Sequence, residues 1–99
     1  MSVPTWVSLV RLQWDFRKHG HESPFSTVGD YEGNSIDTVV DGVRFEFEDR
    51  KSGRDRVGYY DRATNRLTVL TDDELFILSH YRPTRGEAYV RGLLRSTYT

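Results

Sequence analysis

The chain has 99 residues and a mass of 11.6 kDa, a length typical of one domain. Hydrophobic residues make up 36% and charged residues 29% of it, which argues against simple disorder. It contains no apolar run of about 18 residues, the minimum for a membrane-spanning helix. The lack of cysteine excludes disulfides and cysteine-ligated zinc. No signal-peptide pattern follows Met1, so we expect a cytoplasmic protein.

The net charge of −1 conceals an uneven distribution along the chain. Residues 1–21 carry a charge of +2, residues 22–49 carry −7 and residues 50–99 carry +4. Twelve of the 14 cationic side chains are arginine, which suits bidentate contacts with phosphate. Two interpretations follow: either the composition is simply rich in arginine, or both ends of the chain build a phosphate-facing surface.

Two helices are predicted in the first forty residues. Residues 5–19 fit both a strand and a helix, because apolar residues alternate yet also recur on one helical face. We favour a helix with Thr5 as the N-cap and Gly20 as a left-handed stop. The second helix spans residues 27–40 and begins at a capping box that starts with Thr27.

After the second helix the pattern changes to the period of two that is typical of strands. Four strands are predicted, beginning at Val43 and continuing over Arg56–Tyr60, Arg66–Thr71 and Leu75–Tyr81. The last run is almost wholly apolar, so we expect it to be the central strand, buried on both faces. A second capping box, from Thr84 to Glu87, then predicts a terminal helix.

The expected fold class is α+β. Two N-terminal helices pack on a four-stranded antiparallel meander sheet, and a short C-terminal helix follows. We expect one domain over residues 1–99, with the helical part at about 5–40, the sheet at about 43–82 and the terminal helix at about 85–95.

The motifs of several enzyme classes are missing from the sequence. It has no HExxH metal site, no glycine-rich phosphate loop and no GxSxG elbow, so we expect neither a metal nor a cofactor.

The remaining possibility is acid–base catalysis by histidine. His19 and His21 follow the first helix, and each is either a catalyst or a solvated side chain at a helix end. Ser79 and His80 are consecutive in a strand and therefore face opposite sides of the sheet, with His80 either catalytic or buried and hydrogen-bonded.

Arginine and tyrosine side chains on the strands are the candidates for binding a nucleic acid. Arg66 and Arg82 would hold phosphates, unless they are ordinary surface residues. Tyr60 and Tyr81 would stack on bases, unless they pack in the core.

Two segments carry a resemblance to a known family. They are LQWDFRKHGHESPF, residues 12–25, and GYYDRATNRLTVLTDDELFILSHYRP, residues 58–83. Together with a late tyrosine they resemble the barnase–EndoU–colicin–RelE group of small bacterial ribonuclease toxins. The chain is most similar to the colicin-D-like C-terminal domains of polymorphic toxins, over about residues 11–98.

This resemblance implies metal-independent cleavage of RNA, in which the ribose 2′-OH attacks the adjacent phosphate. His19 matches the family's helix histidine, a general base or acid. Ser79 matches the late-strand hydroxyl that bonds the scissile phosphate, and Tyr89 matches the late tyrosine. Arg82 stands where the family often has a cation before proline, whereas Arg66 is a weaker match.

The implied partners are an RNA substrate and an antitoxin or immunity protein. His80 replaces a more usual aromatic residue, and is either an added catalytic group or a ring in the same place. The acidic block at residues 22–49 would repel RNA unless it faces away from the substrate or binds a basic partner. The alternative function is a non-catalytic RNA-binding or protein-interaction module that kept the same fold.

Overall fold

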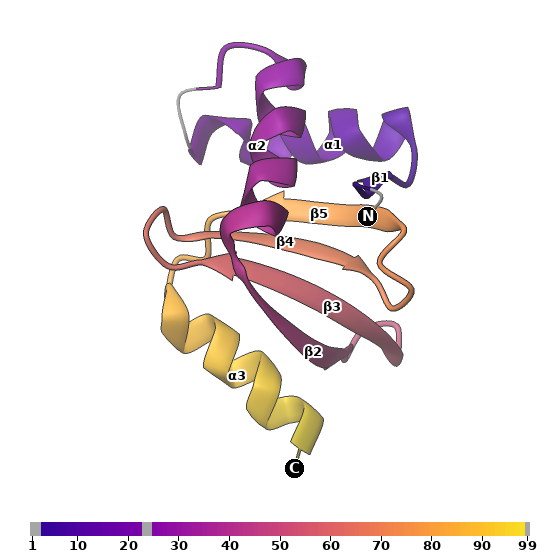
Figure 1. Cartoon of the computed structure of the whole chain (residues 1–99), viewed down its shortest axis with the longest axis vertical. Helices are drawn as coiled ribbons and strands as arrows, with labels where there is room; N and C mark the ends of the chain where they lie inside the picture. The colour runs from indigo at the N-terminus through magenta and orange to yellow at the C-terminus, as the bar shows by residue number, and fades with distance from the viewer. Residues whose placement is uncertain (1–2, 23–24, 99) are drawn as a thin grey trace.

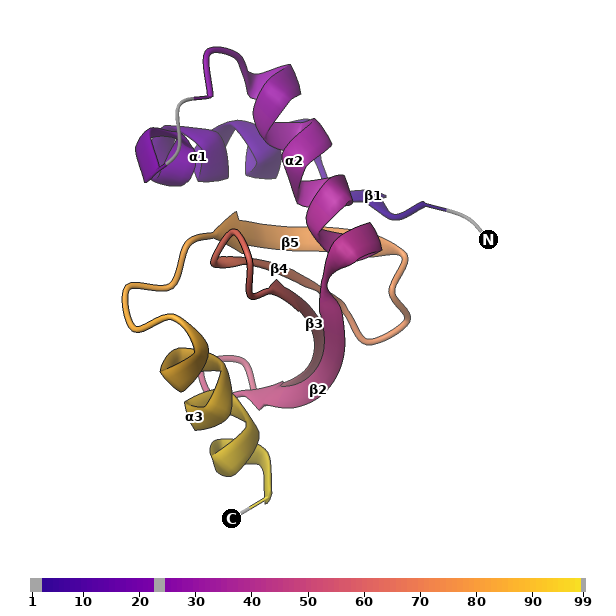
Figure 2. The ribbon, with the colours of Figure 1, turned by 60° about the vertical axis from the view of Figure 1, so that its left-hand side comes forward.

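A computed structural model describes residues 3–22 and 25–98, with side chains as far as Leu94. Its elements are β1 (Thr5–Trp6), α1 (Leu9–His19), a 3-10 turn (Gly20–Glu22), α2 (Val28–Asp41), β2 (Val43–Asp49), β3 (Arg54–Asp61), β4 (Arg66–Thr71), β5 (Phe76–Tyr81) and α3 (Glu87–Tyr98). The fold is α+β, as predicted. Helices α1 and α2 cover one face of a curved sheet, and α3 lies on the other side (Figures 1 and 2).

Within the described residues the sheet has five strands in the order β1-β5-β4-β3-β2, so the prediction of four strands is wrong. Strands β2 to β5 form the expected antiparallel meander, but β1 pairs in parallel with β5. Strand β1 lies within the predicted helix at residues 5–19. It stays extended because Val7 N–H donates to the carbonyl of Ile77 and the Trp6 indole N–H donates to Ser35. Helix α1 therefore begins only at Leu9.

The helix ends also differ from the predictions. Ser8, not Thr5, is the N-cap of α1, and its hydroxyl accepts from the backbone N–H of Arg11. Gly20 is right-handed, with φ −60°, so it is not the predicted left-handed stop. The glycine is needed for space, because a Cβ there would lie 2.6 Å from the ring of Phe16.

Helix α2 confirms its predicted cap, since the Thr27 hydroxyl accepts from the N–H of Asp30. The prediction for α3 is less accurate. It begins at Glu87, and the preceding turn is closed by Gly86, whose φ is +57° and whose N–H donates to Pro83.

Strand β4 is the central strand, with Leu67 to Leu70 all buried. The predicted central strand, β5, is flanked on its outer side by only the two residues of β1. Leu75 and Phe76 at its start are 52% and 39% exposed. These two apolar side chains therefore lie at a partly open side of the sheet and not in its core.

Apolar side chains fill both faces of the sheet. Between the sheet and helices α1 and α2 the buried residues are Trp6, Leu12, Tyr31, Leu70 and Ile77. On the α3 side they are Phe47, Tyr60, Leu67, Val69 and Val90. Among the described helices, none is long and apolar enough to cross a membrane.

A bulge in β5 fixes α1 along that strand. Val69 pairs with Ser79 and Leu70 with Ile77, which leaves Leu78 as the extra residue. The bulge frees backbone groups that α1 then satisfies: Arg11 Nε donates to the carbonyl of Leu78 at 2.8 Å. Oδ2 of the buried Asp15 accepts from His80 N–H and from the hydroxyls of Ser79 and Tyr31. The C-terminal end of α1 is thereby brought beside the end of β5.

Candidate active site

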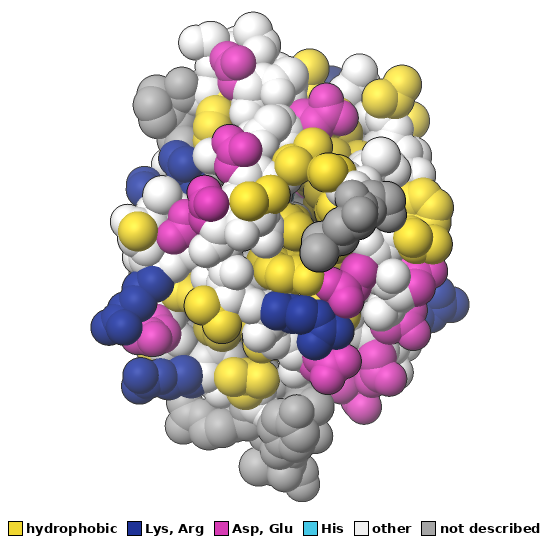
Figure 3. All heavy atoms as spheres, viewed as in Figure 1, with side chains coloured by type: hydrophobic (Ala, Val, Ile, Leu, Met, Phe, Trp, Pro, Cys, Tyr) yellow, Lys and Arg dark blue, Asp and Glu magenta, His cyan; other side chains and the backbone are white. Residues whose placement is uncertain are grey.

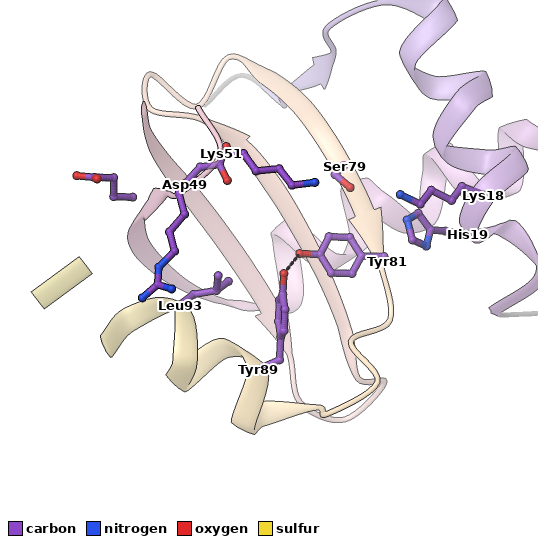
Figure 4. Close-up of a pocket in the computed structure, with 10 residues that line it drawn as sticks. Lys18, His19, Asp49, Lys51, Ser79, Tyr81, Tyr89 and Leu93 are labelled. Carbon is purple, nitrogen blue, oxygen red and sulfur yellow. Dashed lines mark hydrogen bonds between the residues drawn. The ribbon is translucent and has the colours of Figure 1, made fainter. Parts of the chain in front are cut away.

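An open cavity of about 420 Å³ lies between the end of α1, strand β5, the β2–β3 hairpin and the first turns of α3 (Figure 4). We call it the His19 cavity. It is lined by Lys18, His19, Glu48, Asp49, Arg50, Lys51, Ser79, Tyr81, Tyr89 and Leu93. Three residues predicted to act in catalysis from distant parts of the sequence, His19, Ser79 and Tyr89, therefore line one cavity.

His19 is held in place by a carboxylate. Its Nδ1 lies 2.8 Å from Oε2 of Glu22, across the 3-10 turn. A carboxylate oxygen only accepts, so Nδ1 carries the proton and Nε2 of the neutral ring is left as the acceptor. The imidazole also packs against Tyr81, with the ring centres 5.4 Å apart. Glu22 thus selects the tautomer in which Nε2 can take a proton.

Two tyrosine hydroxyls meet at the floor of the cavity. The hydroxyl oxygens of Tyr81 and Tyr89 are 2.9 Å apart (Figure 4). Burial, and then the hydrogen bond to Tyr89, raises the pKa of Tyr81 well above its ordinary value, so that hydroxyl stays protonated. One of the two hydroxyl protons forms the hydrogen bond between the oxygens. The other hydroxyl proton can therefore be donated to a ligand.

Ser79 and His80 face opposite sides of the sheet, as predicted. Ser79 lines the His19 cavity and donates its hydroxyl to Asp15 at 3.1 Å. The oxygen of Ser79 can therefore accept a hydrogen bond from a ligand, while its own proton is directed to the carboxylate.

His80 is 1% exposed and does not reach the cavity. Its ring nitrogens lie 2.8 Å from Oγ1 of Thr68 and Oδ1 of Asn34. Burial, and then the charge of Arg66, lowers the pKa of His80 to about 3. The structure therefore places His80 as a neutral, hydrogen-bonded core residue.

The cavity has a mixed electrostatic rim. Lys18 enters from α1, and Arg50 and Lys51 enter from the β2–β3 hairpin, where Glu48 and Asp49 also stand. The Asp49 carboxylate accepts from the backbone and the hydroxyl of Ser52, and these bonds lower the pKa of Asp49. That carboxylate belongs to the hairpin turn, whereas Lys51 extends over the sheet toward Ser79 (Figure 4).

Arg66 and Arg82 lie on the other side of His19, around a space of only about 10 Å³, the room of about one water molecule. The Arg82 guanidinium donates to the carbonyls of Glu22 and Thr64, and its backbone N–H donates to the Glu22 carboxylate. Arg66 stacks over Phe25 at 5.0 Å. Arg82 thus fixes the segment that carries Glu22, and neither arginine lines the His19 cavity.

Two other predicted residues also lie outside the cavity. Tyr60 is 8% exposed, and its hydroxyl donates to Asn65 in the β3–β4 turn. His21 is exposed at the 3-10 turn. By contrast, Tyr81, predicted only as a base-stacking residue, is at the centre of the site.

Sequence reasoning missed Glu22 and the two lysines, Lys18 and Lys51, as site residues. A signal for Glu22 was present, because it follows His19 by three residues and a helical turn brings such a pair together. No sequence signal joined Lys51 to the site, since the β2–β3 hairpin reaches the cavity only through the curvature of the sheet.

A larger cavity of about 710 Å³ lies on the opposite face, beside α2 (Figure 3). Its walls are mainly apolar and include Ile36, Val39 and Leu70, with Arg44 and Glu74 at the rim. None of the residues predicted to act in catalysis or RNA binding lines it. Among the described residues, no group of three or more histidine or acidic side chains is placed to hold a metal ion.

The sequence matches no family model, and no curated protein is significantly similar to it.

Proposed function

We propose that this chain is a metal-independent endoribonuclease that cleaves RNA by attack of a ribose 2′-OH on the adjacent phosphate. The observation that carries the proposal is the grouping of His19, the Tyr81–Tyr89 hydroxyls and Lys18 in one open cavity, with Glu22 bound to His19 from outside that cavity. Acid–base catalysis with cationic stabilisation of the phosphorane needs these groups and no cofactor.

Each group has a role that follows from its geometry. Nε2 of His19 takes the proton from the 2′-OH, while Glu22 orients the ring and stabilises the imidazolium that forms. The second proton of the tyrosine pair is donated to the 5′-oxygen as its bond to phosphorus breaks. Lys18 and Lys51 offset the charge that develops on the phosphate.

We also propose that the protein acts as a bacterial toxin with an antitoxin or immunity partner. This part of the proposal depends on the resemblance in residues 12–25 and 58–83. Induced expression of the chain alone should slow bacterial growth, and the His19→Ala variant should not.

The direct test is incubation of purified protein with total RNA in EDTA. We expect cleavage by the unmodified chain and a loss of about 10²- to 10⁴-fold in His19→Ala. His21→Ala is the matched control, because it removes an exposed histidine two positions along. Undiminished cleavage by the His19 variant would remove that residue from the mechanism. RNA binding without cleavage by the unmodified chain would support a non-catalytic binding module.

A further inference from the structure

The His19 cavity continues into a second cavity of about 300 Å³ along the sheet. The two share six lining residues, namely Asp49, Lys51, Ser79, Tyr81, Tyr89 and Leu93, so they form one groove. The residues that line only the second cavity, which we call the Arg11–Arg56 compartment, are Arg11, Phe47, Arg56, Val69 and Leu78.

Helix α1 places two cations along one side of this groove. Arg11 and Lys18 are seven residues apart, which is two helical turns or about 10 Å, and such residues share one helix face. Stacked nucleotides rise about 3.4 Å along one strand, so this spacing exceeds one nucleotide. Arg11 is anchored by its bond to the Leu78 carbonyl, which fixes its charge at the strand bulge.

The other side of the compartment carries Arg56, which pairs with Phe47 across β2 and β3 and with Thr71 across β3 and β4. Its guanidinium has a hydrogen bond only to the neighbouring Asp55 carbonyl among the described contacts. Between the two arginines the floor consists of apolar side chains, namely Phe47, Val69 and Leu78. An apolar floor between two cations suits a base on the floor and phosphates at the rims.

The charge of the whole groove also favours an extended anion. Its rims carry five cations, namely Arg11, Lys18, Arg50, Lys51 and Arg56, against the two carboxylates Glu48 and Asp49. Asp49 stays ionised, because the hydrogen bonds from Ser52 and the charge of Arg56 lower its pKa, so its charge counts against the five cations. Phosphates placed along the groove would therefore meet a net positive rim.

We propose that the substrate is a single-stranded RNA that fills both compartments, with the nucleotide next to the cleaved linkage in the Arg11–Arg56 compartment. This inference rests on the proposed function. A base that packs on this floor, where Leu78 is more exposed than Phe47 and Val69, must be unpaired, because the bases of an RNA duplex are stacked on each other and its narrow major groove excludes side chains. Arg11 and Arg56 bind phosphate away from the reaction and are not catalytic residues.

The test uses two chimeric substrates, a dinucleotide and an octanucleotide, each with one ribonucleotide in an otherwise deoxy strand. The variant is Arg56→Gln, and the matched control is Arg85→Gln, an exposed arginine that does not line the groove. Values of kcat/KM are measured for both substrates at fixed salt.

We expect kcat/KM to be higher for the octanucleotide, and Arg56→Gln to lower that value about tenfold, mainly through KM. Arg56→Gln should leave kcat/KM for the dinucleotide unchanged. Arg85→Gln should leave kcat/KM unchanged for both substrates. An equal effect of Arg56→Gln on both substrates, or none on either, would overturn the inference while leaving the proposed nuclease intact.

If the unmodified chain cuts neither substrate, the proposed nuclease activity is wrong. The two-compartment groove is then tested by measuring RNA binding. The probe is then the same octanucleotide with a 2′-O-methyl group at the ribonucleotide. Binding that Arg56→Gln weakens about tenfold supports the two-compartment groove, and binding insensitive to that change contradicts it.

Discussion

At the scale of single residues, a carboxylate in a turn determines what a histidine can do. Glu22 binds the Nδ1 side of His19 and the backbone N–H of Arg82 with its two oxygens. It therefore ties the end of α1 to the end of β5. The same residue fixes both the position and the tautomer of the proposed base.

Glu22→Gln should lower kcat for RNA cleavage about tenfold and leave KM nearly unchanged, because the amide still fills the space but no longer stabilises the imidazolium. Glu46→Gln, an exposed glutamate of β2, is the control. A kcat equal to that of the unmodified chain would contradict the role given to Glu22.

His80 leads to a prediction about stability and pH. Burial lowers its pKa from 6.5 to about 3, so between these values the unfolded chain binds a proton that the folded chain does not. Stability is therefore complete above about pH 6.5 and is lost as the pH falls. From pH 7 to pH 5 this one group should cost about 2 kcal/mol of unfolding free energy.

The measurement is urea unfolding at both pH values for the unmodified chain, His80→Gln and His21→Gln. The His80 variant should lose that part of the pH dependence, whereas removal of the exposed His21 should leave it. The same pH dependence in all three proteins would refute the assignment of a neutral buried His80.

At the scale of elements, the position of α1 depends on one buried carboxylate. Asp15 is 7% exposed and accepts from the backbone of β5, from Ser79 and from Tyr31 of α2. It therefore joins two helices to the bulged strand. The cavity exists because this contact aligns the end of α1 with Tyr81.

Asp15→Ala should lower the unfolding free energy by about 3 kcal/mol, because it leaves the His80 N–H and the Ser79 hydroxyl without their acceptor, whereas the Tyr31 hydroxyl keeps the His80 carbonyl. Asp37→Ala, an exposed aspartate of α2, should change stability by less than about 0.5 kcal/mol. Thermal and urea unfolding check both values. Similar losses in the two variants would contradict the anchoring role of Asp15.

Elements with a long, regular pattern were predictable from the sequence. Helix α2 and strands β2 to β4 follow from hydrophobic periodicity and from the cap at Thr27. Strand β1 was not predictable, because a strand of two residues is too short to show hydrophobic periodicity. Its pairing with β5 also depends on residues far away in the sequence. For the same reason the sequence predicts β5 as the central strand, whereas its true position, second from the edge, depends on the tertiary order of strands.

The site was predictable to the extent that strand alternation and helix ends determine it. The opposite orientations of Ser79 and His80 follow from the strand, and the place of His19 follows from the end of its helix. The role of Arg82 did not follow, because its bonds to Glu22 and Thr64 join segments far apart in sequence. Nor did the buried state of His80, which depends on Thr68 and Asn34.

At the scale of the whole molecule, the sheet separates the charges that the sequence carries in blocks. Asp30, Asp37 and Asp41 are on α2, which packs against the face of the sheet opposite to α3. The cations of α1 and of the β2–β3 hairpin border the groove on the α3 side. Most of the acidic block is therefore kept away from the proposed RNA path, with Glu22, Glu48 and Asp49 as the exceptions.

The proposed activity of this groove is cleavage of RNA through a 2′-OH. The most direct measurement is mass analysis of the products from an oligonucleotide with a single ribonucleotide, incubated with the chain in EDTA. We predict one cut, after that ribonucleotide, with a 2′,3′-cyclic phosphate on the upstream product and no cut in the all-deoxy strand. An intact chimeric strand, or equal cleavage of the all-deoxy strand, would contradict cleavage through a 2′-OH.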